Sequence, residues 1–318
     1  MQSVGFPNHS GIAEANGQTR LLSLPIDRPR PNARLGQSRS WSERWEERLQ
    51  PVLQDPTDAI VRITTSTICG TDLHILKGDV PSVTEGRILG HEGVGEMTQV
   101  GRAVSTFHPG DRVLISCITS CGRCDFCRKQ MYSHCRHAGW ILGSTIDGTQ
   151  AGHVRIPYAD TSLYGIPPAA DEEALVMLSD ILPTGFECGV LNGQVHPGDT
   201  VAIVGAGPVG LAALLTAQFY SPGASVMVDL DDNRLEVAKR LGATTLINST
   251  DGEAAQRVMD LTAGHGVDVA FEAVGVPATF GEYEHCRSIS RCNRRQAVRT
   301  QLFACAQRTP AGIGYADA

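Results

Sequence analysis

The stretch Thr200-Val-Ala-Ile-Val-Gly-Ala-Gly-Pro-Val-Gly210 decides the fold of this chain. Its first five residues are apolar and mostly β-branched, which predicts a buried strand over Thr200–Val204. The glycines that follow predict a tight turn, and a helix is expected over Val209–Phe219. A helix that begins after such a turn presents free N–H groups and the positive end of its dipole to phosphates. The pattern predicts a dinucleotide site at Gly205, Gly207, Pro208, Val209 and Gly210, with a glycine-rich turn that binds nothing as the alternative.

Strands and helices continue to alternate after this turn. Strands are predicted at Ser225–Asp229, Thr245–Ile247 and Val267–Phe271, and helices at Arg234–Leu241 and Glu253–Thr262. Such alternation is typical of a Rossmann fold, an α/β arrangement in which a doubly wound parallel sheet has helices on both faces. Gly242 is expected to end the second helix with a left-handed backbone.

An acidic residue marks the end of the second predicted strand. In dinucleotide sites a carboxylate about 20 residues beyond the glycines accepts hydrogen bonds from the ribose hydroxyls. Asp229 stands at that place and would repel a 2′-phosphate, so the sequence favours NAD over NADP. Arg234 is a candidate for contact with the adenosine ribose, although a solvated helix residue is the alternative.

Length and composition limit the domain number, the structural class and the partners that this chain can have. Its 318 residues are enough for two domains, and 42% hydrophobic with 19% charged residues exclude a disordered chain. Because only 5% of the residues are aromatic, the core is expected to consist of Val, Ile, Leu and Ala. The net charge of −7 argues against nucleic acid or an anionic membrane as a partner. No secretory segment and no apolar run of about 20 residues is found, which predicts a cytoplasmic chain.

The region before residue 186 has a different pattern. Short β-branched runs predict strands at Ala59–Thr65, Gly93–Val100, Asp111–Ile118 and His153–Ile156, and the composition becomes helical over Asp171–Val190. The chain is therefore expected to hold a mostly β domain over residues 43–185 and a nucleotide-binding domain over residues 186–284.

Four of the ten cysteines form a compact array. Cys121, Cys124, Cys127 and Cys135 have the spacing C-x2-C-x2-C-x7-C, which suits a tetrahedral structural zinc ion. An iron–sulfur cluster is the rival, but the ferredoxin run has three residues and then a proline after its third cysteine. Disulfides and a zinc ribbon that reads nucleic acid are weaker alternatives, because the compartment is expected to be reducing and the chain is acidic. The neighbouring Cys117, on an apolar run, is expected to be a packed core thiol.

Three further residues are candidates for a catalytic metal site. Cys69 lies in Cys-Gly-Thr-Asp-Leu-His, His91 in Gly-His-Glu, and Asp180 in Leu-Ser-Asp-Ile-Leu-Pro. A catalytic zinc needs three protein ligands and one open position. Each residue taken alone also has an ordinary structural explanation: Cys69 as a buried thiol, His91 as a turn histidine and Asp180 as a helix cap.

The motifs together resemble the zinc-dependent medium-chain alcohol dehydrogenases, in particular the secondary-alcohol and threonine-dehydrogenase-like branch. The resemblance rests on Cys69-Gly-Thr-Asp72, Gly90-His-Glu-Gly-Val-Gly95, the four-cysteine array and the Rossmann unit, and it covers residues 45–284. It implies a GroES-like, mostly β catalytic domain beside the Rossmann domain. It also implies two zinc ions per chain, a catalytic one held by Cys69, His91 and Asp180 and a structural one held by the four cysteines.

The resemblance also implies roles in catalysis. Glu92 would be an acid beside the catalytic metal, Thr71 and His74 would relay the alcohol proton, and Trp140 would line the substrate pocket. The implied reaction transfers hydride from an alcohol, expected to be secondary, to NAD and gives an aldehyde or ketone. A zinc-free, quinone-reductase-like enzyme is a further alternative, but it would not need the three metal ligands.

The resemblance stops at both ends of the chain. Residues 1–42 are rich in Pro, Ser and Arg and are expected to be disordered. Residues 285–318 carry six arginines and one acid, and they break the alternation of strands and helices. These ends predict a truncated or frame-shifted copy that lacks the last strands of the sheet. A degenerate chain that binds zinc and NAD without turnover is therefore an alternative, and a family-like homo-oligomer would lack its usual edge strands.

Overall fold

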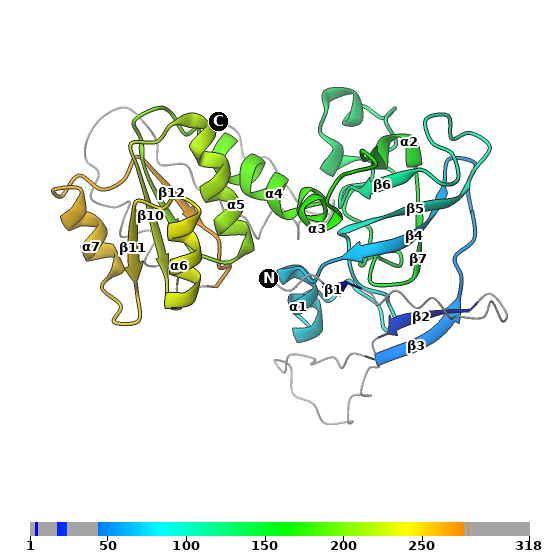
Figure 1. The fold of residues 1–318 in the computed structure, drawn as a ribbon, viewed down its shortest axis with the longest axis horizontal. Coiled ribbons are helices and arrows are strands. Elements are labelled where there is room, and N and C mark those ends of the chain that lie inside the picture. The colour runs from blue at the N-terminus through cyan, green and yellow to red at the C-terminus, as the bar shows by residue number, and fades with distance from the viewer. Residues whose placement is uncertain (1–3, 6–17, 24–43, 277–278, 280–318) are drawn as a thin grey trace. The chain divides into compact units, whose positions relative to one another are not determined.

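The computed structural model describes residues 4–5, 18–23, 44–276 and 279 (Figure 1). The chain forms two compact units, Met1–Asp180 and Ile181–Ala318, and the sequence predicts this division after residue 185. The arginine-rich tail at residues 285–318 lies outside the described residues.

The first unit contains an antiparallel six-stranded sheet. Its strands follow the order β1-β4-β5-β6-β8, and β7 pairs with β4 along the same edge as β1 (Figure 1). Their bounds are Val4–Gly5 for β1, Ala59–Ser66 for β4, Gly93–Val100 for β5, Arg112–Ile115 for β6, His153–Ile156 for β7 and Leu163–Gly165 for β8. A separate antiparallel pair consists of β2 (Gln18–Ser23) and β3 (Arg44–Leu49). This unit is the mostly β domain that the sequence predicts.

The predicted strands agree closely with this sheet, except at β6. The strand expected over Asp111–Ile118 ends at Ile115. Beyond it the main chain turns to other partners, because the N–H of Ser116 donates to Ser162 O and that of Cys117 to Ser179 O. These hydrogen bonds take the place of the next main-chain hydrogen bonds between strands of the sheet.

Part of the segment expected to be disordered is in strands. Within residues 1–42 the structure describes β1 and β2, so the expectation of disorder is wrong for those eight residues. Strand β1 pairs with the end of β4, Val4 opposite Ser66, and β2 pairs with β3. The stabilising partners lie later in the chain, so local composition did not reveal them.

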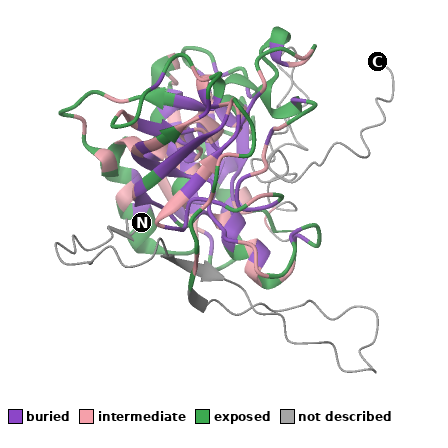
Figure 2. Cartoon of the chain, turned by 90° about the vertical axis from the view of Figure 1, so that its right-hand side faces the viewer, coloured by how far each residue is buried: buried purple, intermediate pink, exposed green. Residues whose placement is uncertain are grey.

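The core of the first unit follows the alternation of its strands. Val61 and Ile63 of β4 are buried together with Met97 of β5. Between them Arg62 faces outward and pairs with Glu96 at 2.7 Å. Figure 2 shows this arrangement as buried strands beneath exposed connecting segments. The side-chain period of two is what a sheet with one buried face requires.

Helices in this unit are short, and the helical region at the boundary is broken. In the first unit they are α1 (Gly70–Lys77), α2 (Ala159–Ser162) and α3 (Glu172–Leu175), with 3-10 turns at Cys127–Lys129, Tyr132–His134 and Val176–Leu178. In the second unit α4 (Ile181–Thr184) is followed by a π-helical stretch at Gly185–Leu191. The helical composition expected over Asp171–Val190 thus corresponds to several short helical pieces. Pro183 contributes to this because it has no N–H to donate.

The second unit is a four-stranded parallel sheet in the order β11-β10-β9-β12. The bounds are Thr200–Val204 for β9, Pro208–Ala217 for α5, Ala224–Asp229 for β10, Asp232–Arg240 for α6, Thr245–Asn248 for β11, Ala254–Leu261 for α7 and Val269–Glu272 for β12, with a 3-10 turn at Gln218–Tyr220. Gly242 has φ +104°, which confirms the expected left-handed residue after α6.

Helices cover both faces of this sheet, as the Rossmann pattern predicts. On one face Ile203 of β9 packs in a cluster with Leu214 of α5 and Leu235 of α6. On the other face Val204 packs in a cluster with Val258 of α7. Among the described residues, no single helix is long and apolar enough to cross a membrane. One bent pair, Glu172–Leu178 with Ile181–Leu191, passes the same test of length and composition.

Candidate functional site

The four cysteines of the array converge in the first unit. Their sulfur atoms all lie within 4.8 Å of one another, and Cys121 Sγ is 3.9 Å from Cys127 Sγ. A tetrahedral zinc with Zn–S bonds of about 2.3 Å would place its sulfurs about 3.8 Å apart. All four thiols are free, so disulfides are ruled out in this structure. The residues therefore fit one zinc ion.

Main-chain N–H groups donate hydrogen bonds to sulfurs of this array. The N–H of Cys121 donates to Cys135 Sγ at 3.3 Å, and that of Cys127 to Cys124 Sγ at 3.5 Å. Main-chain donors at Arg136 and Cys127 lower the pKa of Cys124 to about 6. Burial raises the pKa of Cys127 to about 12. A divalent cation among the sulfurs would supply the charge that lets all four ionise.

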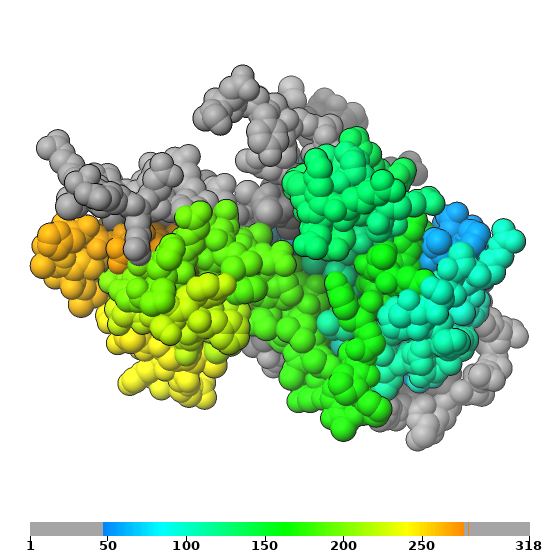
Figure 3. Space-filling view, turned by 90° about the horizontal axis from the view of Figure 1, so that it is seen from above, coloured from blue at the N-terminus to red at the C-terminus, as the bar shows by residue number. Residues whose placement is uncertain are grey.

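The loop that carries these cysteines is closed at its base. Thr119 and Gly139 exchange main-chain hydrogen bonds of 3.0 and 2.8 Å, which form an isolated antiparallel bridge. Within the loop Arg136 forms two hydrogen bonds with Asp125, at 2.6 and 2.8 Å, and stacks over Phe126. The loop is green in Figure 3, at the surface of the first unit.

A second cluster consists of Cys69, His91 and Asp180. Their ligand atoms lie within 4.8 Å of one another, and His91 Nε2 is 3.0 Å from Asp180 Oδ2. Cys69 precedes α1, His91 lies just before β5, and Asp180 follows the 3-10 turn that ends at Leu178. Zinc bonds of about 2.0–2.2 Å to nitrogen and oxygen would place these two atoms about 3.4 Å apart. The three side chains therefore fit one zinc ion with a small adjustment.

The electrostatics of this cluster favour a cation. Burial disfavours a charged imidazole, yet the hydrogen bonds that His91 makes with Asp180 and Cys69 outweigh it and raise the pKa of His91 well above its ordinary value. Without a metal, the hydrogen bonds to Asp180 and Cys69 stabilise the protonated imidazole of His91. Zinc would take the place of that proton, because only neutral imidazole is a ligand.

Asp72 holds two of the ligand segments in place. Its side chain is buried and accepts hydrogen bonds from the N–H of Cys69 at 2.9 Å, the N–H of Gly90 at 3.2 Å and the amide of Gln150 at 3.0 Å. Burial raises the pKa of Asp72, although these donors and the charge of His91 oppose it. Sequence reasoning missed this role. The signal was the spacing Cys69-x-x-Asp72, since Asp72 occupies the third helical position of α1 and closes a capping box.

Only glycine fits at the position of Gly90, directly before His91. Its φ of +91° is left-handed, and a Cβ there would lie 2.7 Å from Thr149 Oγ1 and 2.8 Å from Gln150 N. Any other residue would push this loop away and shift His91.

Three of the four residues implied in catalysis, Thr71, Glu92 and Trp140, lie close to this cluster. Glu92 is buried and accepts a hydrogen bond from the hydroxyl of Thr67. Thr71 Oγ1 lies 3.8 Å from Cys69 Sγ, and the Trp140 ring meets the His91 ring edge-on at 6.1 Å. His74 lies on the last turn of α1.

Cys117 also belongs to these surroundings, which the sequence did not indicate. It is buried, as expected for a core thiol. It also forms a hydrogen bond with Asp180, and burial together with that carboxylate raises the pKa of Cys117 well above its ordinary value. A neutral thiol therefore lies beside the carboxylate of this cluster.

The glycine-rich turn lies in the second unit, between β9 and α5. Gly207 is the N-cap of α5, Pro208 is its first residue and Val209 its second. A Cβ on Gly210 would lie 1.8 Å from Gly205 O, so this glycine lets the helix approach the turn. A Cβ on Gly207 would have nothing within 4 Å, which leaves open space where a pyrophosphate can approach the backbone.

Asp229 ends β10 beside this turn. Its carboxylate accepts hydrogen bonds from the N–H of Ala206 at 2.6 Å and the N–H of Asp231 at 2.9 Å. Arg234 of α6 lies 4.0 Å from both Asp229 and Asp231, with a largely exposed side chain. The carboxylate thus stands next to the turn, where a ribose would be bound.

Comparison with known proteins agrees with this geometry. Residues 55–168 match the model of the alcohol dehydrogenase GroES-like domain, and residues 208–288 match that of the zinc-binding dehydrogenases. The chain is 39% identical over 246 residues to an alcohol dehydrogenase of Cupriavidus necator, a match that covers 71% of this chain and 65% of that protein. The chain thus spans less than two thirds of the length of that relative.

Solved structures show the same fold. A zinc-dependent alcohol dehydrogenase from Streptococcus pneumonia is 56% identical with a TM-score of 0.73, covering 78% of this chain and 70% of that one. A protein from Sinorhizobium meliloti 1021, solved bound to NADP, is 28% identical with a TM-score of 0.68, covering 77% and 70%. The chain belongs to the zinc-dependent medium-chain alcohol dehydrogenase family, with a GroES-like domain and a Rossmann domain.

Proposed function

We propose that this protein oxidises an alcohol, specifically a secondary alcohol, and transfers its hydride to NAD to give a ketone. Primary alcohols would give aldehydes by the same route. The observation that carries the proposal is the convergence of Cys69, His91 and Asp180 in a buried cluster that fits one cation. Zinc bound there supplies a Lewis acid that lowers the pKa of a bound alcohol.

The residues around the cluster would move the proton and shape the site. Thr71 is buried beside Cys69, so its hydroxyl can take the proton from the alcohol oxygen. His74, on the same helix, would pass that proton towards solvent. The Trp140 ring covers one side of His91 and would exclude water from the reacting atoms. Glu92 is held by Thr67 and lies next to the ligand His91.

The other parts of the proposal concern the cofactors. We assign a second, structural zinc to the four-cysteine loop, because its sulfur spacing matches a tetrahedral site. We assign NAD rather than NADP, because the Asp229 carboxylate beside the glycine turn would repel a 2′-phosphate. Free thiols at Cys69, Cys117 and the loop cysteines suit a reducing compartment, so we place the protein in the cytoplasm.

The test measures zinc content and NADH formation on the same sample of the full chain. We expect two zinc ions per chain and a rise in NADH absorbance with a panel of secondary alcohols. Cys69→Ser should lose one zinc and all turnover, whereas Cys188→Ser, which alters a cysteine outside both ligand sets, should keep both zinc ions and full activity. Two bound zinc ions with no NADH from any primary or secondary alcohol would instead identify a zinc-binding chain without turnover.

A further inference from the structure

We infer that Asp79 is a positioning residue for His74, and that the two form a carboxylate–imidazole dyad. This inference rests on the proposed function, in which His74 carries the alcohol proton. It assigns a role to a residue outside the metal ligands, the proton relay and the nucleotide site.

The contact between the two side chains fixes which ring nitrogen carries hydrogen. His74 Nδ1 lies 2.8 Å from Asp79 Oδ2. A carboxylate only accepts hydrogen bonds, so Nδ1 must be the donor. In the neutral ring Nε2 is then the lone-pair atom, and it is the nitrogen that can receive a proton.

The end of helix α1 places the carboxylate against the ring. Gly78 ends the helix with a φ of +85°, a left-handed conformation that favours glycine. The N–H of Gly78 donates to Ile75 O at 2.9 Å, and the N–H of Asp79 donates to His74 O at 3.0 Å. Asp79 thus holds His74 twice, once through its main chain and once through its carboxylate. Only the second contact depends on the side chain.

His74 lies on the helix that also carries Thr71, the other half of the relay. Thr71 and His74 are three residues apart on α1, so they lie on one face of the helix. Thr71 is 5% exposed, whereas the side chain of His74 is 19% exposed and that of Asp79 46%. A path from the buried hydroxyl through the ring therefore leads outward to solvent. Fixing the tautomer makes Nε2 the ring nitrogen that accepts the proton on that path.

Three variants separate the hydrogen bond from the charge. Asp79→Ala removes the acceptor, Asp79→Asn keeps an acceptor oxygen without the charge, and Asp79→Glu tests whether a carboxylate at longer reach restores the dyad. Each retains the main-chain N–H that closes the helix end. Because Asp79 is half exposed, none of them removes buried packing. Asp111→Ala is the matched control, since Asp111 is 45% exposed beside His108 in another part of the sequence.

The direct readout is the tautomer of His74 in the full chain. Nitrogen-15 spectra of histidine-labelled protein would be recorded at about pH 9, above the ordinary imidazole pKa of about 6.5. His74→Gln identifies the His74 signals. We expect the Nδ1–H tautomer in the wild type, and a shift towards Nε2–H in Asp79→Ala that Asp111→Ala does not cause. An Nε2–H tautomer in the wild type, or no change in Asp79→Ala, would overturn the dyad.

Kinetics supply the second readout. Asp79→Ala should lower kcat about tenfold with little change in KM, because it disturbs proton transfer rather than binding. Asp79→Glu should recover part of the loss. A chain that shows the expected tautomers but oxidises no alcohol would keep the dyad and refute the proposed function. An active chain whose kcat is the same in Asp79→Ala would keep the function and refute the positioning role.

Discussion

The carboxylate of Asp72 accepts a 2.9 Å hydrogen bond from the main-chain N–H of Cys69, so a buried acid fixes the backbone of a proposed zinc ligand. The same carboxylate reaches Gly90, next to the ligand His91. One side chain therefore sets the positions of two ligands that lie far apart in the sequence.

Asp72→Asn should weaken zinc binding at the catalytic cluster by about ten- to a hundredfold, because the ligands lose the acceptor that orients them. Competition with a coloured chelator measures this directly. Gln150→Ala should have a smaller effect, since the hydrogen bonds from Cys69 and Gly90 remain. Unchanged zinc affinity in Asp72→Asn would show that the ligands are held by other contacts.

Zinc binding at the catalytic cluster should release a proton from His91. The pKa of His91 is raised, so at neutral pH the metal-free ring is protonated and must lose its proton before it can bind zinc. The apparent affinity should therefore rise with pH until the raised pKa is passed. Calorimetric titrations in buffers with different ionisation enthalpies would count the protons. An affinity that stays constant between about pH 6 and pH 8 would contradict this assignment.

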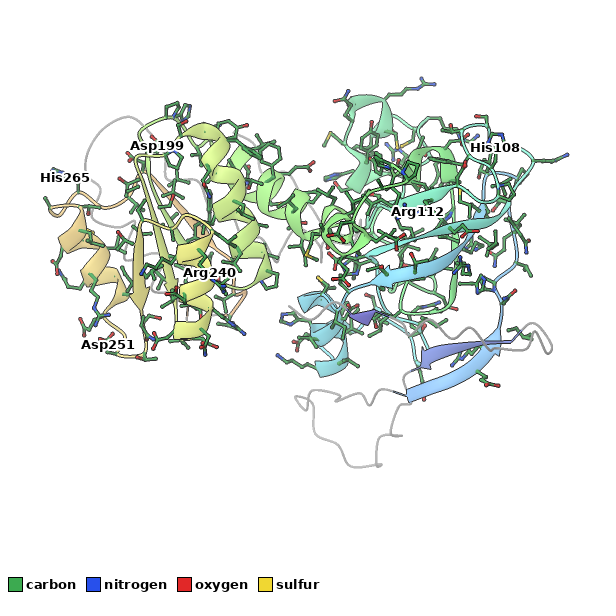
Figure 4. The ribbon with its side chains drawn as sticks, in the orientation of Figure 1. His108, Arg112, Asp199, Arg240, Asp251 and His265 are labelled. Carbon is green, nitrogen blue, oxygen red and sulfur yellow. The ribbon has the colours of Figure 1, made fainter. Side chains whose placement is uncertain are left out.

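Glu172 should stabilise the first unit. Arg112, labelled in Figure 4, donates to Glu172 at 2.6 Å from β6, and Thr64 of β4 donates at 2.7 Å. Burial opposes ionisation, but these donors outweigh it and lower the pKa of Glu172. The stabilisation is thus full above the unfolded pKa of about 4.3 and is lost as the pH falls through the folded value.

Glu172→Gln should therefore cost about 1–3 kcal/mol at pH 7, and this cost should shrink as the pH falls from about 4.3 through the lowered pKa of Glu172. Urea unfolding followed by tryptophan fluorescence reports on this unit, because all three tryptophans lie in residues 1–180. Glu96→Gln breaks an exposed pair with Arg62 on the same sheet and should cost less than about 1 kcal/mol. Equal losses in the two variants would argue against a special role for Glu172.

The glycine turn offers a matched pair of variants. Gly207→Ala should fold like the wild type, because the added Cβ meets nothing, but it should lose NAD affinity at least tenfold because the Cβ occupies the place of the pyrophosphate. Gly210→Ala should destabilise the second unit, because its Cβ would collide with Gly205 O. Thermal unfolding and NAD titration distinguish the two. Normal NAD binding by Gly207→Ala would place the phosphates elsewhere.

Local patterns in the sequence were sufficient for much of the fold. The βαβ alternation predicted β9 and the helix that follows it. Apolar residues repeat with a different period in a strand than in a helix, and a few residues are enough to show that difference. Helix α1 was missed, since Cys-Gly-Thr-Asp at its start looks like a turn and only the hydrogen bonds of Asp72 reveal the cap. Strand β1 was missed because its stability comes from pairing with β4.

The candidate site shows the same limit. Sequence motifs named Cys69, His91 and Asp180 through a family resemblance, but spacing alone could not bring together residues as far apart as His91 and Asp180, which are 89 positions apart. Contacts such as that of Cys117 with Asp180 or Asp79 with His74 depend on side-chain placement, which no motif records. The sequence therefore indicated the candidate site residues, and the structure showed the side-chain contacts that position them.

The bridge between Thr119 and Gly139 makes the four-cysteine loop a removable module. Because its two ends already touch, we expect that the residues between them could be replaced by a short turn while β6 and β7 keep their register. A protein engineer can use the Thr119–Gly139 bridge as the junction at which another loop is grafted onto the scaffold.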